Sequence, residues 1–159
     1  SCLARSPCLM ILIPWRHRRS SACLKENPVK LLLDTHILLW AAGKPEKLSE
    51  PARTMLISPE NKLFFSAASI WEIVIKRRLG REDFKVDPGR LKKMLLSHDY
   101  CELPITAEHA LKVETLPLLH KDPFDRLLLA QARAEGMLLL TVDASVLQYK
   151  ESTLNALNL

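Results

Sequence analysis

Glycine, cysteine and long apolar runs are all scarce in this chain of 159 residues. Only four residues are glycine while 48% are hydrophobic, which excludes a fibrous repeat and a disordered chain. No apolar stretch approaches the roughly 18 to 20 residues that a membrane span needs, so we expect no membrane segment. The sequence also contains neither an internal repeat nor a low-complexity tract. It therefore predicts one globular domain with a proper hydrophobic core.

The few cysteines are placed so that they exclude two further kinds of structure. Three of the four lie before residue 29, which leaves Cys101 alone in the rest of the chain. A lone cysteine cannot form a bridge within its domain, and no Cys/Cys or Cys/His spacing indicates zinc. This usage favours the reducing cytosol, so we expect a cytoplasmic protein.

The excess of positive charge is also concentrated near the start of the sequence. The net charge of +5 suggests a nucleic-acid partner, but residues 1–28 hold five basic residues and a single acidic one. The remaining chain is close to neutral. We expect residues 1–28 to form a poorly packed N-terminal extension and residues 29–159 to form the folded domain.

Strand-like and helix-like segments alternate through residues 29–159. Short apolar runs predict strands at 29–33, 62–65, 100–103 and 137–141, with a marginal edge strand within 151–159. Capping residues, prolines and glycines predict helices at 35–42, 50–57, 67–79, 88–97 and 123–135, and a short one after Thr106. Strands that are apolar on both faces indicate a parallel sheet covered on both sides. The fold class is therefore α/β, a three-layer α/β/α sandwich around four to five parallel strands.

Four acidic residues stand beside these apolar segments: Asp34, Glu72, Asp125 and Asp143. A carboxylate in apolar surroundings is costly unless it is protonated, paired or bound to a cation. Asp34 and Asp143 follow strands directly, and ligands of parallel sheets bind beyond the carboxyl ends of the strands. We therefore expect one acidic pocket that holds Mg²⁺ or Mn²⁺, the ions that all-oxygen sites favour. Such an ion can activate a water and stabilise the charge that develops on a phosphodiester.

Each acid also has a purely structural interpretation. Asp34 and Asp122 can cap helices, Glu72 can pair with Lys76, Asp125 can complement a helix dipole, and Asp143 can begin a turn. Only their shared placement at one end of the sheet favours the functional interpretation.

The segments that carry these acids resemble the PIN-domain family, and most of all the VapC-like toxins of bacterial type II toxin–antitoxin systems. The resemblance extends from residue 29 to about 150 and rests on four blocks: 33–40, 66–80, 122–132 and 140–143. It implies a metal-dependent endoribonuclease selective for single strands, with a Mg²⁺ or Mn²⁺ site. The family's acids correspond to Asp34, Glu72, Asp125 and Asp143, which are the predicted catalytic and metal-binding residues.

The resemblance further implies a homodimer and a VapB-type antitoxin whose tail covers the acidic pocket. Accessory roles at the acids, as hydrogen-bonding, capping or charge-neutralising groups, are predicted for Thr35, Ser69, Asp122, Arg126 and Thr141. A basic patch at the far end of the Glu72 helix is either a track for the RNA backbone or a solvated face: Lys76, Arg77, Arg78 and Arg81.

Histidine and tryptophan are given structural roles. Because a metal-activated water needs no histidine base, His36 and His120 are predicted to be structural. Trp40 and Trp71 are predicted to lie in the core or a dimer interface before they serve as base-stacking platforms. Two other functions stay open: a non-catalytic RNA-binding or protein-interaction module with this fold, and a structure-specific DNA nuclease.

Overall fold

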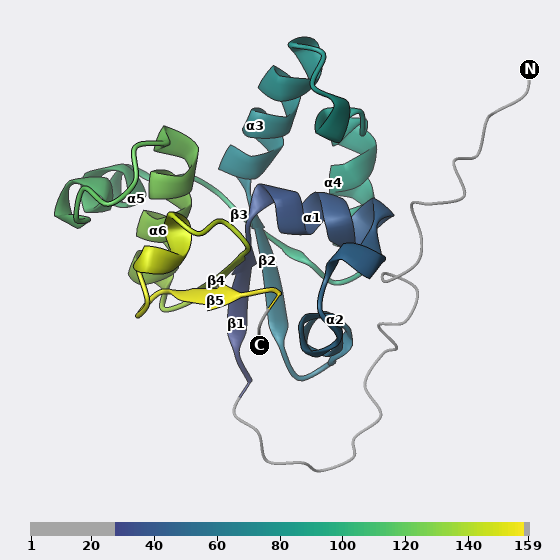
Figure 1. Cartoon of the computed structure of the whole chain (residues 1–159), viewed down its shortest axis with the longest axis horizontal. Coiled ribbons are helices and arrows are strands. Elements are labelled where there is room, and N and C mark those ends of the chain that lie inside the picture. The colour runs from purple at the N-terminus through teal and green to yellow at the C-terminus, as the bar shows by residue number, and fades with distance from the viewer. Residues whose placement is uncertain (1–27, 158–159) are drawn as a thin grey trace, which may run out of the picture.

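A five-stranded parallel sheet forms the centre of the chain in the computed structural model, which describes residues 28–157 (Figure 1). The strand order is β3-β2-β1-β4-β5, and every neighbouring pair is parallel. The strands are β1 (Lys30–Leu33), β2 (Lys62–Ser66), β3 (Cys101–Leu103), β4 (Leu138–Thr141) and β5 (Thr153–Asn155). The predicted sheet is thus confirmed, and the marginal tail strand exists as β5 at one edge.

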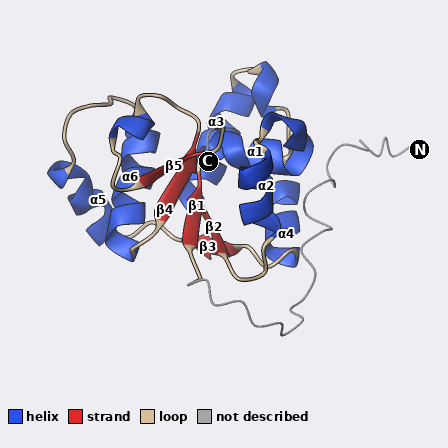
Figure 2. Cartoon of the chain, turned by 60° about the horizontal axis from the view of Figure 1, so that its bottom comes forward, coloured by secondary structure: helices blue, strands red, loops and turns tan. Residues whose placement is uncertain are grey.

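Helices cover both faces of this sheet, which confirms the three-layer sandwich (Figure 2). One layer holds α1 (Thr35–Gly43), α2 (Glu50–Ile57), α3 (Ala67–Arg78) and α4 (Pro88–Ser97). The other holds α5 (Ala107–Lys112) and α6 (Pro123–Glu135). Short 3₁₀ turns at Pro45–Lys47, Glu82–Phe84, Val113–Thr115 and Val146–Gln148 connect these elements.

The apolar strands bury side chains on both faces of the sheet. In β1, Leu31 and Leu33 join the core cluster under α1, α2 and α4, while Leu32 joins the cluster under α6. Successive side chains of a strand point to opposite faces, so a strand between two helical layers must be apolar at every position. This requirement explains why the central strands lack the alternation of polar and apolar residues.

Helix boundaries follow the capping residues that the sequence predicts. The side chains of Ser49, Ser66, Asp87 and Thr106 accept hydrogen bonds from backbone N–H groups in the first turns of α2, α3, α4 and α5. Gly136 ends α6 at φ +64°, a left-handed conformation that suits glycine. Local sequence therefore determines where these helices start and stop.

The chain reverses its direction of travel across the sheet between β1 and β4. From β1 it moves outward through β2 to β3, and β4 then returns to the other side of β1. In open parallel sheets, such a switch point leaves a crevice beyond the carboxyl ends of the strands, where ligands bind. Asp34 directly follows β1 and Asp143 closely follows β4, so both lie at this crevice.

The structure does not describe the two ends of the chain, residues 1–27 and 158–159. The predicted extension, residues 1–28, lies outside the described residues except for Pro28 and stays a prediction. None of the helices between residues 28 and 157 has the length and apolar character needed to cross a bilayer.

Candidate metal centre

Asp34 occupies the centre of the crevice and is held on both carboxylate oxygens. Its Oδ1 accepts a hydrogen bond of 2.6 Å from the Thr35 N–H, and its Oδ2 accepts one of 2.7 Å from the Thr141 hydroxyl. The residue is 4% exposed. Asp34 also caps α1, which confirms its structural interpretation and is compatible with the predicted metal binding. Thr141 makes the acid contact that its predicted accessory role requires.

Glu72 lies beside Asp34 but is engaged by its own chain. Its Oε2 accepts a 2.5 Å hydrogen bond from the Thr35 hydroxyl, and its Oε1 forms an ion pair with Lys76 one helical turn away. Thr35 thus joins the two acids, through its N–H to Asp34 and its hydroxyl to Glu72. The predicted metal ligand Glu72 therefore lies at the site, but both of its carboxylate oxygens already have partners within the chain.

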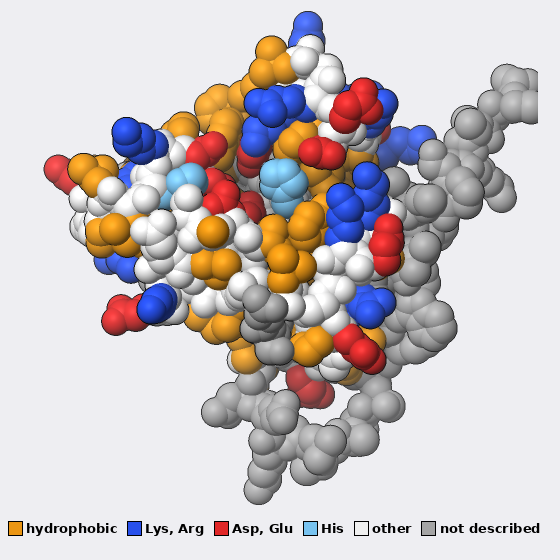
Figure 3. All heavy atoms as spheres, in the orientation of Figure 1, with side chains coloured by type: hydrophobic (Ala, Val, Ile, Leu, Met, Phe, Trp, Pro, Cys, Tyr) orange, Lys and Arg blue, Asp and Glu red, His pale blue; other side chains and the backbone are white. Residues whose placement is uncertain are grey.

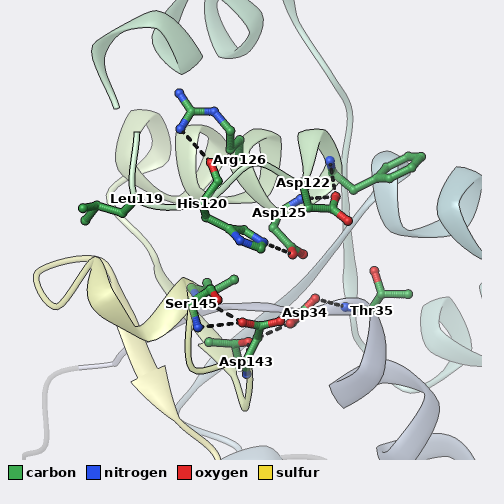
Figure 4. Close-up of polar contacts among 12 residues, drawn as sticks. Asp34, Thr35, Leu119, His120, Asp122, Asp125, Arg126, Asp143 and Ser145 are labelled. Carbon is green, nitrogen blue, oxygen red and sulfur yellow. Dashed lines mark hydrogen bonds and ion pairs between the residues drawn. The ribbon is translucent and has the colours of Figure 1, made fainter. Parts of the chain in front are cut away.

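Asp125 and Asp143 form the outer part of the site together with His120 (Figure 4). The His120 Nε2 lies 2.6 Å from the Asp125 Oδ2. One ligand atom from each of these three residues lies within 4.8 Å of the others. Asp143 also begins a turn, because its Oδ1 accepts from the Ser145 N–H at 2.7 Å. Figure 4 shows Asp125 and His120 pointing across the crevice toward Asp34 and Asp143.

His120 is the residue that the sequence interpretation left out of the site. An acid–base role is the one that the sequence suggests for it, and a metal-activated water makes a histidine base unnecessary. The available signal was its position two residues before the helix cap Asp122 and five before Asp125. That spacing places its side chain at the same helix start as the acid.

Burial and mutual repulsion raise the proton affinity of two of the acids. Desolvation raises the pKa of Asp34, more than its hydrogen bonds from Thr141 and Thr35 lower it. Desolvation, followed by repulsion from Asp34, raises the pKa of Asp125 from 3.8 to about 7. Asp34 and Asp125 are therefore close enough for their charges to repel each other. Without a cation, Asp125 keeps part of its proton near pH 7.

The raised pKa values predict how stability changes with pH in the presence of chelator. Between about pH 4 and 7 the folded chain keeps a proton on Asp125 that the unfolded chain has lost, from the pKa values of 3.8 and about 7. The free energy of unfolding therefore falls as the pH rises through this window. The fall is about 1.4 kcal/mol for each unit by which the pKa is raised, which amounts to a few kcal/mol at most. Urea unfolding at pH 5 and pH 7.5 measures the change.

Asparagine at position 125 provides the control for this pH dependence. We expect Asp125→Asn to flatten the fall, because the amide does not titrate. Bound Mn²⁺ should weaken the fall as well, since a metal ion needs the deprotonated carboxylate. If the free energy of unfolding depends on pH equally in the wild type and in Asp125→Asn, Asp125 is not the group responsible.

Two predicted accessory residues, Asp122 and Arg126, serve the fold. The Asp122 Oδ1 accepts from the Phe124 and Asp125 N–H groups at 2.8 and 3.4 Å, which makes it the cap of α6. Arg126 is expected to neutralise the acids, but no ion pair or hydrogen bond joins it to an acid among the described residues. Its guanidinium turns away and donates to the carbonyls of Val113, Leu116, Pro117 and His120 and to the Tyr149 hydroxyl.

The predicted basic patch is only partly available for RNA. Lys76 is bound to Glu72, and Arg77 lies 3.7 Å from Asp87. Arg78 and Arg81 are exposed. The RNA-binding role of the patch therefore stays a prediction that rests mainly on these two arginines.

A recess at the centre of one molecular face gives access to the acids. In Figure 3, acidic side chains gather there with histidine on either side and hydrophobic side chains below. A pocket of about 300 Å³ adjoins the acids and is lined by Asp34, His36, Trp40, Lys47, Asp83, Val142 and Asp143. Trp40 is half-buried in this wall. Trp71 is 56% exposed and meets Phe124 edge-on, so it lies outside the core, and its predicted place in a dimer interface stays a prediction.

The donor set fits a divalent cation. Asp34, Asp125 and Asp143 supply carboxylate oxygens, the ligands that Mg²⁺ and Mn²⁺ accept, and a cation would relieve the repulsion between Asp34 and Asp125. Ser69, one turn before Glu72 on α3, has a fully buried hydroxyl with no hydrogen-bond partner among the described residues. An orphaned buried hydroxyl is unusual in a folded protein.

Known proteins share this arrangement of sheet and helices. The VapBC2 complex of Rickettsia felis bound to a promoter DNA fragment matches with a TM-score of 0.57 at 18% identity, over 78% of this chain and 93% of that one. A toxin–antitoxin complex from Klebsiella pneumoniae matches with a TM-score of 0.53 at 18% sequence identity, over 81% of this chain and 99% of that one. VapBC-1 from nontypeable Haemophilus influenzae matches with a TM-score of 0.52 at 16% sequence identity, over 80% of this chain and 98% of that one. At these identities the likeness establishes the fold.

Sequence comparison gives the family. No curated protein matches the chain. The PIN domain profile, in contrast, matches residues 31–151, from β1 to the turn before β5, and so includes every acid of the crevice. The chain therefore belongs to the PIN domain family.

Proposed function

We propose that the chain is a metal-dependent endoribonuclease that hydrolyses RNA phosphodiester bonds. The observation that carries the proposal is the convergence of Asp34, Asp125 and Asp143 at the switch point of the sheet, with repulsion between Asp34 and Asp125. Carboxylates kept this close favour a hard divalent cation, and phosphate oxygens are natural further ligands of such an ion. Membership of the PIN domain family supports nuclease chemistry at this place.

The three carboxylates would hold Mg²⁺ or Mn²⁺ beside the scissile phosphate. The bound ion supplies activation of a water and stabilisation of the charge that develops during in-line attack. The chain's own contribution is rigidity: the Thr35 N–H and the Thr141 hydroxyl fix both oxygens of Asp34 before substrate arrives. Such preorganisation matters because misplacement by about 1 Å is costly in catalysis.

Glu72, the fourth acid predicted to bind the ion, and its partner Lys76 would act on the same site. Lys76 forms its ion pair with Glu72 and lies 4.9 Å from the ring centre of Phe84, so its charge is held close to the acids. A fixed positive charge here offsets part of the negative charge of the crevice and favours approach of a phosphate. Glu72 would orient Thr35, whose N–H in turn orients Asp34.

We further propose that this nuclease acts as a toxin restrained by a VapB-type antitoxin. The support is the fold likeness to chains from the Rickettsia and Haemophilus VapBC complexes, together with the family. A cytoplasmic location and a homodimer belong to the same proposal. Sedimentation of the purified chain tests the dimer, since the monomer mass is 18.1 kDa.

Incubation of the purified chain with defined single-stranded RNAs tests the nuclease. We expect cleavage with Mg²⁺ or Mn²⁺ and none with chelator, because the acids cannot activate water without a cation. Gel separation of end-labelled RNA measures the products. Single-stranded and duplex DNA of the same sequence are included to test the substrate class.

Three results would contradict the proposal in different ways. Cleavage that persists in chelator excludes the metal mechanism. Cleavage of duplex DNA in preference to RNA favours the structure-specific DNA nuclease. RNA binding without cleavage under every metal condition favours the non-catalytic module.

A further inference from the structure

A histidine completes the ring of acids on the open side of the crevice. The His120 Nε2 lies 2.6 Å from the Asp125 Oδ2 and within 4.8 Å of an Asp143 oxygen. The His120 and Asp125 side chains are 17% and 15% exposed, so an ion and its waters can reach them. We propose that the His120 Nε2 is itself a ligand of the divalent ion, which makes the site one of mixed nitrogen and oxygen donors.

The state of Glu72 supports this assignment. Both Glu72 oxygens are bound within the chain, one by Thr35 and the other by Lys76. Releasing Oε1 would leave the Lys76 ammonium without its acidic partner in a half-buried position. Asp34, Asp125 and Asp143 have no comparable lysine or arginine partner among the described residues. His120 is therefore a protein donor that can complete the set formed by these three acids.

The backbone around His120 is fixed in the manner expected of a ligand. The carbonyl of His120 accepts from the buried Arg126 guanidinium at 3.3 Å. The Tyr149 hydroxyl donates to the Pro117 carbonyl at 2.6 Å and accepts from the Leu119 N–H at 3.2 Å. These contacts hold the segment before α6 so that the imidazole points at the acids (Figure 4). A ligand held by surrounding hydrogen bonds binds more tightly than a mobile one.

Nitrogen ligation has a consequence for the choice of ion, and this consequence rests on the proposed metal-dependent function. Mg²⁺ strongly favours oxygen ligands, whereas divalent first-row transition metals also accept imidazole. A site with His120 among its ligands should therefore prefer Mn²⁺ over Mg²⁺. The alternative is that His120 only orients Asp125 through their hydrogen bond, in which case its loss would weaken both ions equally.

Pulsed EPR of Mn²⁺ bound to the full chain distinguishes these roles without an activity assay. We expect nitrogen coupling to the Mn²⁺ spin, which changes from a ¹⁴N to a ¹⁵N signature when the protein is grown with ¹⁵N-histidine. His120→Gln should abolish the coupling and weaken Mn²⁺ binding at least about tenfold, with a smaller effect on Mg²⁺. Titration calorimetry with each ion alone measures the two affinities.

His36→Gln is the matched control for this experiment. His36 lines the pocket beside Asp34 and Asp143 but supplies no atom to the group of ligands. We expect this variant to keep the nitrogen coupling. Coupling that survives in His120→Gln, or equal weakening of both ions, would overturn the assignment.

The outcomes also separate this inference from the proposed function. Mn²⁺ that binds to the wild type without histidine coupling, while RNA is still cleaved, overturns only the role of His120. A wild type that binds neither Mn²⁺ nor Mg²⁺ overturns both. Because the ¹⁵N-histidine comparison uses the unaltered chain, the result does not depend on whether a variant folds.

Discussion

Replacing Asp34 by asparagine is expected to reduce RNA cleavage by at least about 10³-fold, equivalent to roughly 4 kcal/mol of transition-state stabilisation. Asp34 lies between the two parts of the crevice: Thr35 links it to Glu72, and its charge acts on Asp125. An amide cannot supply the negative charge that holds a divalent ion there. Initial rates on an end-labelled RNA, with saturating Mn²⁺, measure the loss.

The same substitution should not destabilise the fold in chelator at neutral pH. Desolvation is the largest influence on the Asp34 carboxyl, so its charged form is costly in the folded chain. Asparagine keeps an oxygen that can accept from Thr35 or Thr141 but carries no charge. We therefore expect Asp34→Asn to raise or maintain the urea midpoint while it removes activity, as is common where function needs a strained site.

Glu60→Gln provides a control for the Asp34 result. Glu60 is an exposed acid in the turn between α2 and β2. Its loss changes the net charge by the same amount and should leave cleavage unchanged. Expression in growing bacteria extends the comparison to the toxin proposal: wild type and Glu60→Gln should arrest growth, and Asp34→Asn should not. Cleavage within threefold of wild type in Asp34→Asn would refute the assigned role of this carboxylate.

The elements of the fold are predictable because their signals are local. Ser66 and Asp122 each accept a hydrogen bond from the N–H two residues later, a contact that depends only on the residue types at the cap. The all-apolar strands likewise report burial on both faces. Asp34 and Asp143 could be placed at one sheet edge because parallel strands share the direction of their carboxyl ends.

The remaining features of the site depend on contacts that sequence patterns do not record. The Thr141 hydroxyl reaches Asp34 across 107 positions of the chain, and Thr35 reaches Glu72 across 37. The basic character of Arg126 indicates a partner for the neighbouring Asp125, yet its length lets it reach carbonyls of residues 113–120, which precede α6. His120 joins the acids because the loop before α6 folds back onto Tyr149. These arrangements follow from packing between layers.

The second large effect concerns Arg126, which is 9% exposed and donates to five oxygens of the chain. Arg126→Met should lower the free energy of unfolding by about 3–5 kcal/mol, because a buried charged donor and its hydrogen bonds to four carbonyls are lost. Arg126→Lys should be intermediate, since an ammonium cannot reproduce the spread of a guanidinium. Urea unfolding in chelator measures both variants.

Arg78→Met is the matched control for this last prediction, because it removes the same charge and adds the same side chain at an exposed position of α3. Its effect should stay within about 0.5 kcal/mol, as is usual for surface substitutions. In Arg126→Met protein that remains folded, the segment that carries His120 lacks its hydrogen bonds to Arg126, so the affinity for Mn²⁺ should fall as well. A loss of stability no larger than that of Arg78→Met would show that water replaces the guanidinium at these carbonyls. The segment before α6 would then be held by Tyr149 and its packing alone.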